Sequence, residues 1–136
     1  MGDPETQPIM MRLKSDLFDV LWAGTEGKLD QVELEWDRRV ALGVVMAAHG
    51  YPLSPRKGDA ITGLPAEQDD AVVFHAATAK QGDTLVTTGG RVLCVTALGD
   101  SVKLAQQRAY EVAGGVFFDG AQYRRDIGFR AIRPAP

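Results

Sequence analysis

With 136 residues, 45% of them hydrophobic and 24% charged, the chain is long enough for one globular domain with a sizeable core. Its formal net charge of -3 provides no basic field for a nucleic-acid backbone, so we expect no nucleic-acid partner. No apolar stretch approaches the roughly 20 residues that cross a bilayer, and the single cysteine suits a reducing compartment, so we expect a cytoplasmic protein without a membrane partner.

The first predicted element is an amphipathic helix over residues 8–23. Apolar side chains recur along it at the helical period of 3.6, at Ile9, Leu13, Leu17, Val20 and Leu21. Pro8 suits the first helical turn, and Gly24 provides a stop. We expect Leu13 and Leu17 to be buried, either against the β-rich part that follows or against a domain outside this chain.

Short apolar runs separated by Gly, Pro or Asp then predict a small, mainly antiparallel β unit. The runs cover residues 32–36, 40–48, 60–62, 72–78, 84–87 and 92–97. Turn sequences at 81–83 and 88–90 would fold residues 72–97 into a three-stranded meander. Cys94 lies inside the last run, where a buried thiol is expected.

A second helix is predicted to follow the meander. Residues 100–101 offer an N-cap, Val102, Ala105, Ala109 and Val112 form an apolar stripe, and glycines 114–115 end it. Residues 117–132 are interpreted as a loop and a last short strand, with Pro134 and Pro136 frayed.

Two carboxylates flank a rigid proline at the start of the chain, directly before the first predicted helix. Asp3 and Glu5 could hold charge in a fixed place there and orient an amine or a cation. The alternative is that both side chains only cap the helix that they precede. Local chemistry leaves both interpretations open.

These first residues also carry a resemblance to a known family. The segment Gly-Asp-Pro-Glu-Thr-Gln at 2–7, followed by Pro-Ile-Met at 8–10, is similar to a signature of the phosphoribosylamine-glycine ligases. The remaining residues agree with that family over nearly the whole chain, in the segments 50–52, 57–59, 73–76, 89–93, 118–120 and 122–128.

The resemblance implies an α+β fold in two parts. Residues 1–36 would be the tail of an ATP-grasp domain, containing the signature loop and a helix. Residues 37–136 would be a small antiparallel β-rich C-terminal domain with one helix, similar to the C-terminal domain of biotin carboxylase and its rudiment single hybrid motif. This domain would cover the active site and shape a ribose-phosphate pocket.

The activity that the resemblance implies is ATP-dependent ligation of glycine to 5-phosphoribosylamine. ATP and Mg2+ would be bound by residues upstream of the signature segment, so no metal site is expected on this chain and neither cofactor is expected to bind it alone. The chain is therefore expected to be inactive in isolation. The alternative is a stand-alone β-rich binding module that kept the fold and lost the chemistry.

Within the signature segment, the resemblance implies catalytic roles for Asp3 and Glu5. It implies substrate contacts for Gly2 and Pro4, which hold the two carboxylates in a fixed conformation.

Three cations are placed nearest to an anionic substrate by this interpretation. Arg56 and Lys57 lie on a proline-flanked loop, and Arg91 follows two glycines. Lys57 could instead be a solvated loop charge, and Arg91 could pair with Asp119 or Asp126 to hold the tail against the sheet.

Other polar residues are given structural interpretations. Residues 123–126 could clamp a phosphate, although alternating charges more often form surface ion pairs. His75, in an apolar run, is expected to be a core or edge histidine with one hydrogen bond. Two separated histidines and one cysteine cannot form a zinc site by local spacing.

Overall fold

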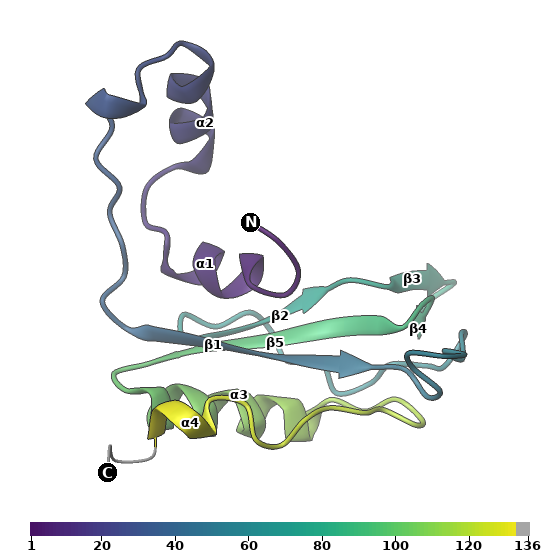
Figure 1. Cartoon of the computed structure of the whole chain (residues 1–136). Coiled ribbons are helices and arrows are strands. Elements are labelled where there is room, and N and C mark those ends of the chain that lie inside the picture. Colours follow the sequence, from purple (N-terminus) through teal and green to yellow (C-terminus); the bar gives the residue numbers. More distant parts are fainter. Residues whose placement is uncertain (133–136) are drawn as a thin grey trace.

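The structure, a computed structural model, describes residues 1–132 (Figure 1). In chain order its elements are α1 (Thr6–Arg12), α2 (Leu17–Thr25), the 3-10 helix η1 (Leu29–Gln31), β1 (Val40–Ala47), β2 (Ala71–His75), β3 (Thr78–Gln81), β4 (Thr84–Thr87), β5 (Arg91–Gly99), α3 (Val102–Gly115) and α4 (Phe129–Ile132). The predicted α+β class with antiparallel strands is therefore confirmed. No helix of the described part is long and apolar enough to cross a membrane.

The core is built around a three-stranded antiparallel sheet of order β1-β5-β2. The central strand, β5, is buried on both faces from Val92 to Leu98, because α3 packs against one face of the sheet and α1 against the other (Figure 1). Cys94 is 3% exposed, as expected, and its burial raises the pKa of its thiol.

Helix α3 packs against the sheet through small side chains. Ser101 caps it by accepting a hydrogen bond from the backbone N–H of Leu104. Ala105, Ala109 and Ala113, spaced four residues apart, are buried on one face of the helix. Methyl side chains let the helix axis approach the sheet closely. The predicted second helix is confirmed with its cap, and of its predicted stripe Ala105 and Ala109 are buried whereas Val102 and Val112 are half-buried.

The predicted meander is wrong: the run 72–78 is divided between β2 and β3, and β5 does not pair with β4. β3 and β4 form a separate two-stranded hairpin around Gly82, whose φ of +61 suits the tight turn. β5 then leaves the hairpin and pairs with β2 and β1. The turn at residues 88–90 therefore connects the hairpin to the larger sheet. The apolar side chains of β5 are buried there, between β1 and β2.

The helix predicted over residues 8–23 is two helices, separated by an extended segment after Arg12. The Asp16 side chain accepts a hydrogen bond from the N–H of Phe18 at 2.8 Å and starts α2 afresh. The N–H of Lys14 donates to the carbonyl of Glu35 at 2.9 Å. Long-range pairing and a local cap thus replace the hydrogen bonds that a continuous helix would have made.

Three further strand predictions are wrong. Residues 32–36 and 60–62 make only isolated bridges, Leu13 with Trp36, Ala60 with Val86 and Thr62 with Phe117. Residues 117–132 end in the helix α4, because the N–H of Phe129 bonds to the carbonyl of Asp126 within the segment. Pro134 and Pro136 lie outside the described residues.

Candidate functional site

The signature segment forms a tight turn that leads into α1. The carbonyl of Gly2 accepts hydrogen bonds from the backbone N–H of Thr6 at 3.1 Å and from its hydroxyl at 2.5 Å. Glu5 occupies the N-cap position, but its side chain makes no capping hydrogen bond. Helix capping by Asp3 and Glu5 side chains therefore receives no support, because the Asp3 carboxylate has a different partner.

That partner is Arg91, the first residue of β5. The Arg91 Nη2 atom lies 2.8 Å from the Asp3 Oδ2 atom, and both side chains are about half exposed. The alternative that Arg91 pairs with Asp119 or Asp126 is wrong. Asp119 pairs instead with Arg56, and Asp126 pairs with Arg124.

The ion pair borders a pocket of about 440 Å³. This volume is within the range of about 300–1,000 Å³ that small-molecule sites occupy. Its lining brings together the signature segment, strand β1, the loop after it and the C-terminal loop: Pro4, Val45, Ala47, Tyr51, Arg91, Gln122, Tyr123 and Arg124. Two guanidinium groups and two phenols beside an apolar wall suit an anionic ligand that carries hydroxyl groups.

Long-range backbone contacts bring the far parts of this lining together. Gln122 exchanges two backbone hydrogen bonds with Ala47, at 2.7 and 2.9 Å, and its side-chain amide donates to the carbonyl of Ala48. Tyr51 lies directly over Gly90, where a Cβ atom would overlap its ring. The first contact holds Gln122 of the C-terminal loop at the pocket, and the second places the Tyr51 ring next to the residue before Arg91.

Arg124 is oriented by a two-point ion pair. Its Nε and Nη2 atoms lie 2.9 and 2.7 Å from the two carboxylate oxygens of Asp126. The pair raises the pKa of Arg124 and lowers the pKa of Asp126, mainly through these hydrogen bonds. The surface ion-pair interpretation of residues 123–126 is thereby confirmed for these two side chains, although Arg124 also lines the pocket.

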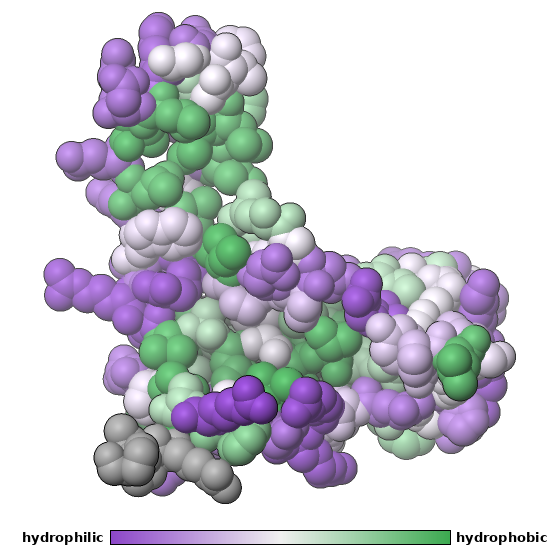
Figure 2. Space-filling model, viewed as in Figure 1, coloured by the Kyte–Doolittle hydropathy of each residue, from purple (hydrophilic) through white to green (hydrophobic). Residues whose placement is uncertain are grey.

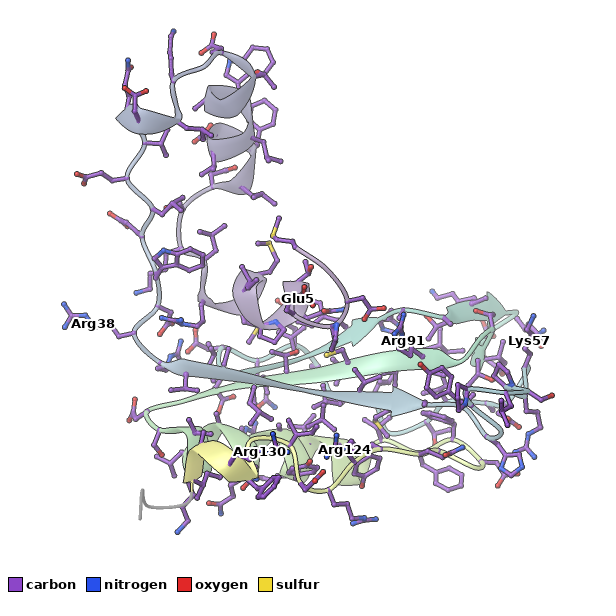
Figure 3. All side chains as sticks on the ribbon, in the orientation of Figure 1. Glu5, Arg38, Lys57, Arg91, Arg124 and Arg130 are labelled. Atoms are coloured by element: carbon purple, nitrogen blue, oxygen red, sulfur yellow. The ribbon has the colours of Figure 1, made fainter. Side chains whose placement is uncertain are left out.

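Arg56 and Lys57 do not line this pocket. Arg56 lies 2.8 Å from a carboxylate oxygen of Asp59 and 2.9 Å from one of Asp119, so it ties two loops together. Lys57 is exposed at one end of the molecule, well away from Glu5 (Figure 3). The structure brings Gly2, Asp3, Pro4, Glu5 and Arg91 together, and it leaves these two cations elsewhere.

Histidines and metal ligands add no second site within residues 1–132. His75 is exposed near the end of β2, and its Nδ1 atom lies 3.0 Å from the Thr78 hydroxyl, as expected for an edge histidine with one hydrogen bond. No group of three or more His, Cys, Asp or Glu in this described range could hold a metal ion.

A family model for the phosphoribosylglycinamide synthetase C domain matches residues 41–130. The chain belongs to this family. The match covers the three-stranded sheet, the hairpin, α3 and the C-terminal loop of the pocket, and it confirms the resemblance drawn from the sequence.

Relatives of the synthetase C domain family extend the match to the N-terminal segment. The chain is 64% identical over 133 residues to a phosphoribosylamine-glycine ligase of Ralstonia nicotianae, covering 98% of this chain and 32% of the relative. A ligase of Vibrio parahaemolyticus is 58% identical over 132 residues, covering 96% and 31%. The chain thus spans about a third of the length of the curated relatives that it matches.

A solved structure shows the same fold. The crystal structure of the Thermotoga maritima phosphoribosylamine-glycine ligase superposes with a TM-score of 0.80 at 40% identity. The match covers 93% of this chain and 31% of that one.

Sequence reasoning missed part of the pocket of this synthetase C domain. It did not single out Tyr51 or Gln122, and it favoured the structural interpretation of Arg124. The glycines at 89–90 were the available signal for Tyr51, because they allow an aromatic ring to lie against the backbone. No local signal marks Gln122, whose position depends on pairing with a strand 75 residues earlier.

Proposed function

We propose that this chain supplies the C-terminal part of an ATP-dependent ligase that joins glycine to 5-phosphoribosylamine in purine biosynthesis, in the cytoplasm. Residues 1–36 would be the tail of the ATP-grasp domain and residues 37–136 the C-terminal domain. The observation that carries the proposal is the ion pair between Asp3 and Arg91, because it ties the signature segment to the edge of a pocket of suitable size.

The reaction requires the glycine carboxylate to become a good acceptor for an amine. ATP supplies this activation as an acyl phosphate, and the amide forms with release of ADP and phosphate. We place ATP and Mg2+ on the part of the ligase outside this chain, as the family resemblance implies. The chain's contribution is to bind and orient the phosphoribosylamine.

Arg91 and Arg124 would attract the phosphate of phosphoribosylamine through charge-assisted hydrogen bonds. Pro4 and the two tyrosines would close around the ribose. Asp3 would keep Arg91 in place, while Asp3 and Glu5 would orient the reacting amine. Gly2 would hold the turn that carries both carboxylates. We retain Arg56 and Lys57 as candidates for substrate contacts, although neither lines this pocket.

The test uses a hybrid ligase in which this chain replaces the matched third of the Ralstonia enzyme. We expect glycine-dependent ADP release from the hybrid. Arg91→Gln and Arg124→Gln should each raise KM for phosphoribosylamine at least tenfold, since each removes a charge-assisted contact of about 1.5–3 kcal/mol.

Lys57→Gln tests the candidate that lies outside the pocket, and an unchanged KM for phosphoribosylamine in this variant would remove Lys57 as a substrate contact. An unchanged KM in both the Arg91 and Arg124 variants, with an active hybrid, would remove the pocket from the proposal. An inactive hybrid that is correctly folded would contradict the ligase assignment itself.

A further inference from the structure

Gln122 lines the pocket beside Arg91 and Arg124, and the proposed function gives it no role. It lies in the loop between α3 and α4, where two backbone hydrogen bonds pair it with Ala47, the last residue of β1. β1 is an edge strand of the three-stranded sheet, so its outer side can take this pairing. The Gln122 side chain therefore starts from a fixed point on the pocket wall.

One interaction fixes the orientation of the Gln122 amide. Its Nε2 atom donates a hydrogen bond to the carbonyl oxygen of Ala48 at 3.1 Å. A carbonyl oxygen can only accept, so the NH2 half of the amide faces Ala48 and the Oε1 atom is directed away from it. Ala48 is fully buried, and its carbonyl also accepts from the backbone N–H of Tyr51 at 3.1 Å, so a buried part of the protein holds the amide in place.

The Oε1 atom of this amide is left as an open acceptor. Within residues 1–132 no side chain or backbone group donates a hydrogen bond to it. Gln122 is exposed, so a ligand in the pocket can reach the atom without displacing a protein donor. An oriented, unpaired acceptor in a pocket wall suits a ligand group that carries a hydrogen to donate.

The other polar groups of the lining suit a different part of a ligand. The guanidinium groups of Arg91 and Arg124 only donate hydrogen bonds, and they suit the oxygens of a phosphate dianion, which only accept. The phenols of Tyr51 and Tyr123 can do either. Gln122 Oε1 is therefore the only side-chain group of the described lining that acts purely as an acceptor.

The amide is also neutral, which matters next to a phosphate. A carboxylate in its place would repel the phosphate that the two arginines attract, whereas an amide oxygen accepts a hydrogen bond without adding negative charge. Figure 3 shows Arg91 and Arg124 on opposite sides of β1, and Figure 2 shows hydrophobic residues over the middle of the sheet with hydrophilic residues along its border. This arrangement suits a sugar phosphate, whose ring can lie against the apolar wall between its charged group and its hydroxyls.

We propose that Gln122 is a specificity-determining residue, whose Oε1 atom accepts a hydrogen bond from a ring hydroxyl of a pentose phosphate while Arg91 and Arg124 bind the phosphate. This inference rests on the proposed function, which places phosphoribosylamine in the pocket. A sugar phosphate that lacks the hydroxyl displaces water from Oε1 and leaves the atom without a partner, so the site discriminates against deoxyribose phosphates.

The test measures the binding of three sugar phosphates to the hybrid ligase by calorimetry, which needs no turnover. The ligands are ribose 5-phosphate and its 2-deoxy and 3-deoxy analogues. We expect ribose 5-phosphate to bind about five- to tenfold more tightly than one of the two analogues, as the loss of one neutral hydrogen bond implies. Gln122→Met should remove this preference and leave the affinity for that analogue unchanged.

Gln106→Met is the matched control. Gln106 also donates its amide to a backbone carbonyl, that of Ile127 at 2.8 Å, and it does not line the pocket. This variant should keep the full preference for ribose 5-phosphate. Thermal melting on the same samples checks that both variants are folded.

A purely structural role for Gln122 gives a different result. Gln122→Met would then weaken the binding of all three sugar phosphates by the same factor and leave their ratios unchanged, and that outcome would overturn the inference. Equal affinities for the three ligands in the unsubstituted hybrid would overturn it as well. A folded hybrid with the Gln122-dependent preference but no glycine-dependent ADP release would contradict the ligase assignment and leave the inference standing. An active hybrid without the preference would do the reverse.

Discussion

Replacing Asp3 by Asn and Glu5 by Gln, one at a time in the hybrid ligase, tests the proposed catalytic role of the signature segment. Asp3 loses an ion pair at 2.8 Å whose two side chains are about half exposed. Such a pair contributes about 1 kcal/mol or less to the free energy of unfolding. Glu5 makes no capping hydrogen bond, so its replacement should change stability even less.

The catalytic effect should be much larger. If the two carboxylates orient the reacting amine, loss of that orientation in at least one variant should lower kcat/KM for phosphoribosylamine by about 10²-fold, or about 2.7 kcal/mol of transition-state stabilisation. The assay is glycine-dependent ADP release, with thermal melting measured on the same samples. Stability and activity should therefore separate clearly.

Asp69→Asn is the matched control, because Asp69 also pairs with an arginine, at 3.1 Å, but its side chain is 90% exposed and does not line the pocket. It should alter neither kcat/KM nor the melting temperature measurably. Normal kinetics in both signature variants would refute the reasoning and make the segment a structural element.

Three further predictions concern the isolated chain. It should release no glycine-dependent ADP, since the proposal places the nucleotide on residues outside it; measurable release from the purified chain would require a nucleotide site within it. The Arg39 side chain holds the pKa of Asp37 well below its usual range, so the stability from this pair is present above about pH 4 and is lost as the pH falls through the folded-state pKa. Urea unfolding should accordingly show that Asp37→Asn destabilises the chain at neutral pH and that the difference from wild type shrinks in acid; a pH-independent difference would contradict this. Gly99→Ala should destabilise the chain by about 1–3 kcal/mol, because its Cβ would overlap the backbone at Ala105. Gly114→Ala, which has open space around it in α3, should stabilise the chain by up to about 1 kcal/mol. Equal effects of the two variants on chemical denaturation would argue against the close contact at Gly99.

Local signals were sufficient for several elements. The strand within residues 40–48, the helix α3 with its cap, and the turn at Gly82 all depend on residues close together in the sequence, and all were predicted. The signature segment indicates the family by its sequence alone, and the family model and relatives agree with it. Its catalytic role stays a prediction.

The errors have two causes, which are competition from distant partners and local bonding that the pattern did not show. The helical period of residues 8–23 was genuine, but pairing of Leu13 with Trp36 and the Asp16 cap divided the helix. Leu13 and Leu17 are each only half buried, so neither is enclosed by the β-rich part. The last strand became α4 because its backbone bonds locally.

The sequence alone determined the family and the α+β class, because these depend on motifs and on short-range periodicity. Only the tertiary structure decided which residues meet. It paired Arg91 with Asp3, placed Arg124 beside the same pocket, and left Arg56 and Lys57 outside it. The physical reason is that charge pairing and pocket formation depend on contacts between residues far apart in the sequence. Several carboxylates were chemically equivalent partners for Arg91, and the fold places Asp3 2.8 Å from it.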